Sequence, residues 1–226
     1  MTRAVLFDTE TTGLEWQQGH RIIEIAALEL INDLATGRHF HVLIDPEREI
    51  PEDATRIHGF TVVDLAGKPR FADIAERLLS FFGDGPLIAH NAAFDFDFLN
   101  AELARLRQPP LRASRMRDTL ALAKARFPGL PNSLDALCRR FAIDLSARTS
   151  HNALLDCRLL SEVYIELTGG RQRGLSLVPS RTDSAVTVLC TIPHVRVPRP
   201  IVPSNAELAA HNALLSRLRD PVWLSD

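Results

Sequence analysis

The sequence predicts an α/β fold, a mixed sheet flanked by helices, followed by an extended tail that ends in a short helix. Segments rich in Val, Ile, Leu and Phe occupy the first 44 positions, whereas hydrophobic residues at helical spacing dominate later, up to residue 168. After Gly169-Gly170 the chain becomes proline-rich, and six of its 14 prolines lie between residues 171 and 226. Such a composition is typical of a linker and not of a packed core.

Three strands are expected at 4–8, 21–31 and 38–44, where apolar and β-branched residues gather between turn-forming segments. The connections between them are short, which favours an antiparallel meander. A fourth, buried strand is expected at 86–89, because this short apolar run follows a glycine-rich break.

Helices are expected wherever apolar residues recur every three or four positions between proline and glycine breaks. These segments are 71–82, 93–107, 118–127, 133–141 and 151–168. Another short helix is expected after Ser204, because Ser204 and Glu207 stand at capping-box spacing and leucines recur at helical spacing beyond them.

Composition limits the classes of function. A chain of 226 residues suffices for one ordinary domain and an extension, and no apolar run approaches the ~20 residues of a membrane-spanning helix. Asp8 comes too early for a signal peptide, so we expect a cytoplasmic protein.

The cysteines, Cys138, Cys157 and Cys190, show no zinc-ligand spacing and favour reduced, structural thiols. The formal net charge of −2 disfavours coating of duplex DNA but permits a grip on one strand end.

Two carboxylates end the first strand, in the run Phe7-Asp8-Thr9-Glu10-Thr11-Thr12-Gly13. Strand periodicity places Asp8 and Glu10 on the same face, where they repel each other unless cations join them. Hard divalent cations prefer such oxygen ligands. A solvated strand end with ordinary turn residues is the alternative, and for this triplet alone it is slightly favoured.

A third carboxylate follows the strand at 86–89, in the run His90-Asn91-Ala92-Ala93-Phe94-Asp95-Phe96-Asp97. Asp95 is well placed for a metal, and Asp97 is its rival. Acidic residues in a first helical turn interact favourably with the helix dipole. That explanation suits Asp97 better, so Asp95 is the predicted ligand.

The fourth carboxylate, Asp156, lies inside the apolar pattern of a predicted helix and would face the core, where a metal could compensate its charge. His151 stands just before the regular pattern and could take a proton from the attacking water. A surface-loop histidine is the alternative. Four carboxylates and one histidine are the inventory for two divalent cations that act on a phosphodiester.

These residues resemble the DEDD exonuclease superfamily. The resemblance implies that Asp8, Glu10, Asp95 and Asp156 bind two divalent ions, Mg²⁺ or Mn²⁺, in an RNase H-like fold. His151, five positions before Asp156, resembles the catalytic histidine of the DEDDh branch, whereas a sister branch carries a tyrosine where this chain has Asn152.

Within that branch the sequence resembles the family of proofreading (epsilon) subunits of bacterial DNA polymerase III, over roughly 4–170 and again near the C-terminus. The matching runs are Asp8-Thr9-Glu10-Thr11-Thr12-Gly13, Ile57-His58-Gly59, His90-Asn91-Ala92-Ala93-Phe94-Asp95 and Asn132-Ser133-Leu134-Asp135-Ala136-Leu137-Cys138.

The resemblance implies a 3′→5′ exonuclease that releases nucleoside 5′-monophosphates from single-stranded 3′ DNA ends. It also implies that Thr11, Asp53 and His58 reach the terminal nucleotide, together with the ligands Asp8, Glu10 and Asp156. A standalone DEDDh enzyme for DNA repair or RNA trimming is one alternative. A mainly structural tether between polymerase and sliding clamp is another, of a different class.

The resemblance divides the chain into an exonuclease domain at 1–170, a flexible linker at 171–203 and a polymerase-binding segment at 204–226. In the linker, Gln172, Leu175 and Leu177 resemble a sliding-clamp peptide, although Leu177 stands where an aromatic residue is common. In the last segment, Leu208, Leu215 and Trp223 are expected to contact the polymerase catalytic subunit. A helix that packs on its own domain, or a disordered tail, is the alternative.

Overall fold

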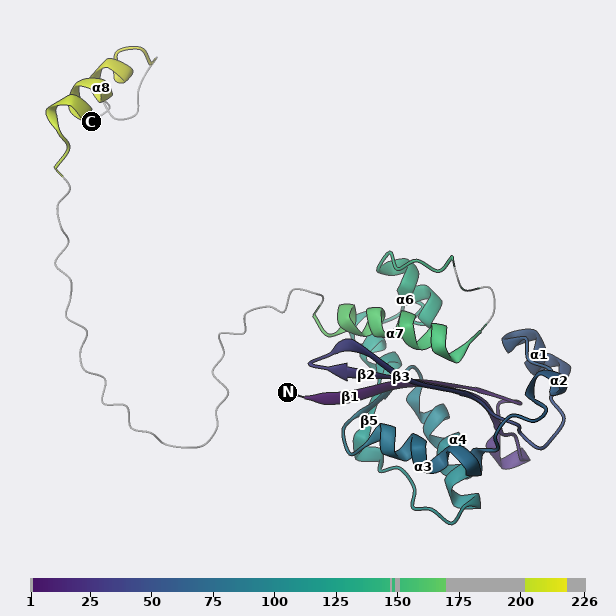
Figure 1. Cartoon of the computed structure of the whole chain (residues 1–226). Coiled ribbons are helices and arrows are strands. Elements are labelled where there is room, and N and C mark those ends of the chain that lie inside the picture. Colours follow the sequence, from purple (N-terminus) through teal and green to yellow (C-terminus); the bar gives the residue numbers. More distant parts are fainter. Residues whose placement is uncertain (1, 147, 149–150, 170–201, 219–226) are drawn as a thin grey trace, which may run out of the picture. The chain divides into compact units, whose positions relative to one another are not determined.

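The computed structural model describes residues 2–146, 148, 151–169 and 202–218 (Figure 1). The chain divides into two compact units, Met1–Ser176 and Leu177–Asp226. The first unit contains a five-stranded sheet in the order β3-β2-β1-β4-β5. Its strands are β1 (Arg3–Thr11), β2 (Ile22–Ile31), β3 (Leu34–Leu43), β4 (Leu87–Ala89) and β5 (Met116–Asp118).

The sheet is mixed, as predicted. The first three strands form an antiparallel meander, whereas β4 runs parallel to β1 and β5 parallel to β4. The strand β1 therefore lies in the middle of the sheet, between β2 and β4. The helices of this unit are α1 (Glu52–His58), α2 (Val62–Leu65), α3 (Phe71–Phe82), α4 (Ala92–Arg105), α5 (Thr119–Arg126), α6 (Leu134–Arg140) and α7 (Ala153–Leu167).

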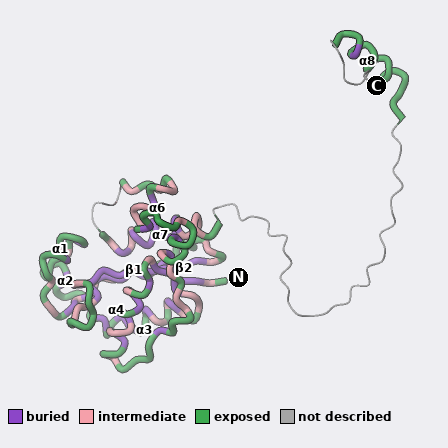
Figure 2. Tube along the Cα trace, turned by 180° about the vertical axis from the view of Figure 1, so that it is seen from behind, coloured by how far each residue is buried: buried purple, intermediate pink, exposed green. Residues whose placement is uncertain are grey.

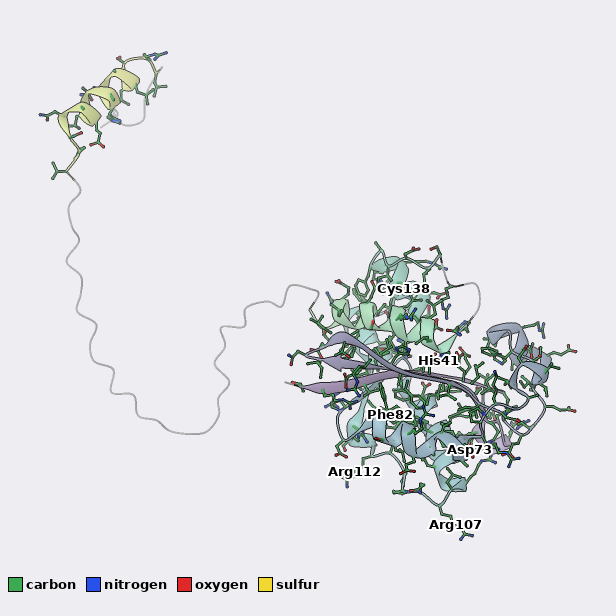
Figure 3. All side chains as sticks on the ribbon, in the orientation of Figure 1. His41, Asp73, Phe82, Arg107, Arg112 and Cys138 are labelled. Carbon is green, nitrogen blue, oxygen red and sulfur yellow. The ribbon has the colours of Figure 1, made fainter. Side chains whose placement is uncertain are left out.

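Helices cover both faces of the sheet, with α6 and α7 on one face and α3 and α4 on the other (Figure 1). Cys138 of α6 and Phe82 of α3 accordingly lie on opposite sides (Figure 3). Each face has its own hydrophobic core. In Figure 2 the central strands are buried along most of their length.

Alternation along β1 assigns its side chains to these two cores. Val5 and Phe7 pack with α3 and α4, whereas Ala4 and Leu6 pack with α7. The even-numbered positions therefore face α7. Asp8 and Glu10 continue that series, so the strand leads its two carboxylates to the side covered by α7.

The sequence did not predict α1, α2 or β5. In α1 only Ala54 and His58 are buried, so the helix has no apolar stripe to detect. β5 has three residues and none is fully buried, which leaves no readable alternation. β3 begins at Leu34, earlier than the predicted start at 38. The prediction missed this part of the strand because its first six residues are exposed and show no alternation.

In the second unit, α8 (Asn205–Leu215) forms after Ser204, as predicted. The Ser204 hydroxyl accepts a hydrogen bond from the Glu207 amide at 3.3 Å, and the Glu207 carboxylate accepts one from the Ser204 amide at 2.8 Å, which completes the capping box. Across the described ranges, no helix has the length and apolar character needed to cross a bilayer.

Candidate active site

The predicted carboxylates come from three elements that meet at the end of β1. Asp8 and Glu10 lie on β1, Asp95 lies in the first turns of α4, and Asp156 lies in the first turns of α7. Glu10, His151 and Asp156 each offer one ligand atom, and these three atoms lie within 4.8 Å of one another. Segments distant in sequence thus form one acidic site.

Asp95 is fixed directly to β1. Its Oδ1 accepts hydrogen bonds from the Thr9 amide at 3.1 Å and from the Thr9 hydroxyl at 2.7 Å, and the residue is 3% exposed. Asp97, the rival candidate, is exposed to solvent. The geometry therefore favours Asp95 over Asp97 as a ligand.

The start of α4 is held by β5. Asn91 adopts a left-handed conformation at φ 64° just before the helix. Asp118 Oδ1 accepts hydrogen bonds from the Asn91 amide at 2.9 Å and from the Ala92 amide at 3.3 Å. This carboxylate satisfies amides that a helix start leaves without partners, and it places Asp95 against Thr9.

The start of α7 is held by β2. Asn152 is the N-cap, and its Oδ1 accepts a hydrogen bond from the Leu155 amide at 3.0 Å. Glu24 Oε2 accepts another from the Ala153 amide at 3.0 Å. Asp156 follows in the same helix and is 4% exposed. His151 lies just before the cap, outside the helix, whereas the predicted helix over 151–168 began at this residue.

Arg148 is a component of the site that the sequence did not reveal. Its Nε and Nη2 donate to the two carboxylate oxygens of Asp156 at 2.6 and 2.7 Å. Its Nη1 donates to Asp135 Oδ1 at 2.8 Å, and Nη2 lies 2.9 Å from His151 Nδ1. Arg148 precedes α7 in a segment without periodic pattern, so no sequence signal marked it.

Burial and mutual repulsion raise the pKa values of three carboxyls. Burial raises the pKa of Asp8 well above its ordinary value, and the charges of Asp95 and Glu10 add to the effect. Burial likewise raises the pKa of Glu10 to about 8 and that of Asp95 to about 7. Divalent ions would compensate the negative charge of such a group of oxygen ligands. The residues therefore fit the metals that the sequence predicts.

The pKa values of Asp156 and His151 differ from this pattern because the two residues pair with each other and with Arg148. Burial acts to raise the pKa of Asp156, but the hydrogen bonds from Arg148 and His151 outweigh it and lower the pKa. The hydrogen bond with Asp156 raises the pKa of His151, although burial and the Arg148 charge oppose this shift. Asp156 is therefore the one of the four carboxyls whose pKa lies below its ordinary value.

A cavity of about 490 Å³ opens beside Glu10 and is lined by Thr11, Asp53, His58 and Phe94, among others. The sequence predicted Thr11, Asp53 and His58 as contacts to substrate. The Asp53 side chain is 86% exposed and pairs with Arg56. Thr11 is buried, and its hydroxyl donates to the Gly13 carbonyl at 2.7 Å.

His58 is the most informative residue of this cavity. It is 4% exposed, and its Nδ1 accepts a hydrogen bond from the Phe60 amide at 3.0 Å. In the neutral ring the proton therefore lies on Nε2. Within the described part of the chain this buried Nε2 has no hydrogen-bond partner. A bound ligand with an acceptor oxygen would satisfy it.

The predicted tail contacts are only partly described. In α8, Leu208 is 44% exposed and Leu215 is 7% exposed. Gln172, Leu175, Leu177 and Trp223 lie outside the described residues. Of the two tail residues that the structure describes, Leu208 is therefore the one whose side chain is accessible to a partner.

Comparisons with known proteins found relatives that match most of the chain. An exonuclease family model, RNase_T, matches residues 5–164. The chain is 45% identical to the DNA polymerase III subunit epsilon of Rickettsia typhi over 222 residues, which cover 96% of each chain. It is 37% identical to the same subunit of Escherichia coli over 225 residues, which cover 95% of this chain and 93% of that one.

Solved structures are similar too. Exonuclease X in complex with 5′ overhanging duplex DNA matches with a TM-score of 0.57 and 28% identity, and the match covers 75% of this chain and 92% of that one. The zinc-bound complex of E. coli ExoI with single-stranded DNA matches with a TM-score of 0.65 and 20% identity, over 76% of this chain and 41% of that one. These likenesses confirm the predicted RNase H-like fold.

Proposed function

The chain belongs to the exonuclease family, and from this membership we propose that it is the 3′→5′ proofreading subunit of a bacterial replicative DNA polymerase. The observation that carries the proposal is the meeting of Asp8, Glu10, Asp95, Asp156 and His151 at the end of β1. The relatives named epsilon, which are similar along almost their whole length, support the replicative role.

We propose that Asp8, Glu10, Asp95 and Asp156 hold two divalent ions, Mg²⁺ or Mn²⁺. All four offer carboxylate oxygen, the ligand that these ions prefer, and three have pKa values raised by burial without a cation. When bound, the ions would lower the pKa of the attacking water and stabilise the departing 3′ oxygen.

The chain's own residues perform the remaining tasks. The side chain of His151 is 49% exposed, so it can take a proton from the attacking water and pass it to solvent. To accept that proton, the imidazole ring must be neutral and its accepting nitrogen must not be hydrogen-bonded to Arg148. The products are a nucleoside 5′-monophosphate and a strand shortened by one nucleotide.

The cavity beside Glu10 is the proposed site of the terminal nucleotide. The proton on His58 Nε2 would reach an acceptor oxygen of the nucleotide, with Thr11 and Asp53 alongside. Preference for mispaired ends needs no reading of the base, because a mispaired end frays more easily and enters the site as a single strand.

The test is Mg²⁺-dependent digestion of 5′-labelled single-stranded DNA and RNA of the same sequence. Stepwise shortening of the DNA from its 3′ end, absent in Asp8→Ala, is the expected result. Preference for RNA would favour an RNA-trimming DEDDh enzyme. A rate of DNA digestion that is the same with and without the polymerase catalytic subunit would favour a standalone repair enzyme. Absence of digestion, even with the polymerase catalytic subunit added, would favour the structural tether.

The tail is the proposed partner-binding region of this cytoplasmic replication protein, with a linker at 171–203 after the catalytic domain at 1–170. We propose that 204–226 binds the polymerase catalytic subunit through Leu208, Leu215 and Trp223. Leu208→Arg and Trp223→Ala should each weaken that complex in a pull-down, whereas Val202→Ala, at a position 83% exposed before α8, should not. Equal binding by all four proteins would contradict the assignment.

We propose that the peptide at 172–177 binds the sliding clamp through Gln172, Leu175 and Leu177. Gln172→Ala should weaken clamp binding, and Leu177→Phe should strengthen it because an aromatic anchor fills an apolar pocket better. Surface plasmon resonance with immobilised clamp measures both. No change in either variant would remove this peptide as the clamp contact.

A further inference from the structure

Glu24 is a buried carboxylate that the proposed chemistry does not use. It lies on β2, directly opposite Glu10 in the register of the sheet, and it is fully buried. Its Oε1 accepts hydrogen bonds from His41 Nε2 at 2.7 Å and from Asn152 Nδ2 at 3.0 Å, and its Oε2 accepts one from the Ala153 amide at 3.0 Å. His41 lies on the side of the sheet that α7 covers (Figure 3).

The contacts of Glu24 explain how a further buried carboxylate is tolerated beside an acidic site. A buried charge is costly unless it is hydrogen-bonded. The amides at a helix start lack intrahelical acceptors and carry partial positive charge, which favours a carboxylate there. Glu24 therefore joins β2 to the first turn of α7, and both elements gain from the contact.

That turn carries the reacting groups. Asp156 lies three residues after Ala153, and His151 lies one residue before Asn152. The His151 amide also donates to the Ile57 carbonyl at 3.2 Å, so the backbone at His151 is held from a second side. Because Glu24 is paired with Glu10 across two adjacent strands, the Glu24 contact sets the position of α7 relative to Glu10.

We propose that Glu24 and Asn152 act as a pair of positioning residues that fix His151 and Asp156 against Asp8 and Glu10. The inference rests on the proposed function, because it concerns the same site. Asn152 has two tasks in it: its Oδ1 caps the helix through the Leu155 amide, and its Nδ2 donates to Glu24. Small displacements of ligands weaken metal sites strongly, so loss of the Glu24–Asn152 contact should impair both metal binding and turnover.

The experiment reverses the polarity of this hydrogen bond. In Glu24→Gln, the new side-chain amide donor faces groups that are themselves donors, Asn152 Nδ2 and the Ala153 amide. In Asn152→Asp, the new carboxylate faces the Glu24 carboxylate. Each single variant should lower kcat and Mn²⁺ affinity by about 10- to 100-fold, the range for groups that orient metal ligands. The double variant Glu24→Gln with Asn152→Asp restores one donor and one acceptor with the same total charge. Its kcat and Mn²⁺ affinity should return to within about threefold of the wild-type values. A double-mutant cycle would report this recovery as a coupling energy between the two residues.

Two further variants separate positioning from folding. His39→Ala removes an exposed histidine of the same strand, β3, whose printed hydrogen bond goes to Gly37 and not to Glu24, so kcat should stay within about threefold of wild type. Asn152→Ser keeps a capping oxygen and removes only the donor to Glu24, so the protein should fold normally while kcat falls. Circular dichroism of each variant at the assay temperature verifies the fold.

The readouts are kcat and KM on single-stranded DNA and Mn²⁺ binding followed by electron paramagnetic resonance. Near-normal kcat and Mn²⁺ affinity in Glu24→Gln, or a double variant no better than the single ones, would overturn the proposal. If the wild-type protein binds Mn²⁺ but does not degrade DNA, the proposed function fails, whereas the Mn²⁺ titrations of the four proteins still decide whether the pair positions the ligands.

Discussion

Arg148 and Asp156 form a two-bond ion pair, with Nε–Oδ1 and Nη2–Oδ2 distances of 2.6 and 2.7 Å. His151 Nδ1 lies 2.9 Å from the same Nη2, and because arginine donates and never accepts, Nδ1 accepts this bond only in the ring form that carries no proton there. One guanidinium thus engages both a proposed metal ligand and the proposed base. It stands in the place of a cation, and a metal at Asp156 must compete with it.

Arg148→Ala should therefore raise Mn²⁺ affinity, by about tenfold if the lost competition is worth about 1.4 kcal/mol. The same change should lower the stability of the metal-free protein, because it leaves Asp156 buried without its partner. Electron paramagnetic resonance and thermal unfolding in EDTA measure the two effects. Arg158→Ala, an exposed position on α7 with the same charge change, is the control. Weaker Mn²⁺ binding in Arg148→Ala would show that Arg148 organises the ligands and does not compete with the metal.

Asp8→Asn should stabilise the protein in EDTA although it abolishes cleavage. Burial and the neighbouring carboxylates raise the pKa of Asp8, so its charge is unfavourable in the folded state without metal. A gain of about 1 kcal/mol would raise Tm by about 2–4 °C in a chain of this size. Thermal unfolding with EDTA and with Mn²⁺ tests this. A lower Tm in EDTA would contradict the repulsion inferred for the site.

The stability of the metal-free protein should fall as pH rises from about 4.5 to 8. The pKa of Glu10 is raised to about 8 and that of Asp95 to about 7, so the folded state keeps protons that the unfolded state loses. The stabilisation from these groups is complete below their unfolded pKa values and is lost as pH passes the folded ones. Mn²⁺ replaces the protons, so the Tm gained from Mn²⁺ should be larger at pH 8.5 than at pH 6. Glu10→Gln should reduce this difference, and an equal gain at both pH values would count against proton–metal competition.

His151→Gln should lower kcat by about 10²- to 10⁴-fold, the usual contribution of a positioned general base. Mn²⁺ and DNA binding should change little, because the four carboxylates and the cavity remain. Single-turnover cleavage and Mn²⁺ titration measure the two properties. His39→Gln makes the same chemical change at an exposed position of β3 and should be silent. Normal turnover in His151→Gln would remove this residue as the base.

His58→Ala should raise KM more than it lowers kcat. The buried Nε2 donor would be satisfied by the nucleotide, and a hydrogen bond to a charged group contributes about 1.5–3 kcal/mol, or roughly 10- to 100-fold in affinity. Steady-state kinetics on single-stranded DNA separate the two constants. An unchanged KM would indicate that the donor is satisfied in another way and that the terminal nucleotide lies elsewhere.

Local patterns in the sequence predicted much of the fold and of the site. Alternation along β1 placed Asp8 and Glu10 on one face, and the apolar spacing of α7 turned Asp156 inward. These inferences succeed because backbone periodicity determines side-chain direction over a few residues. The same patterns missed α1 and β5, since a helix with two buried residues and a strand with none carry no periodic signal.

The sequence by itself thus determined which residues could serve as ligands and which elements carry them. Only the tertiary structure decided how those elements are held together. Thr9 meets Asp95 across 86 positions and Glu24 meets Ala153 across 129, and each contact satisfies a buried polar group. Arg148 reaches Asp156 from a segment without pattern. Such contacts depend on where the packed sheet and helices bring distant side chains, and no periodicity along the chain encodes that arrangement.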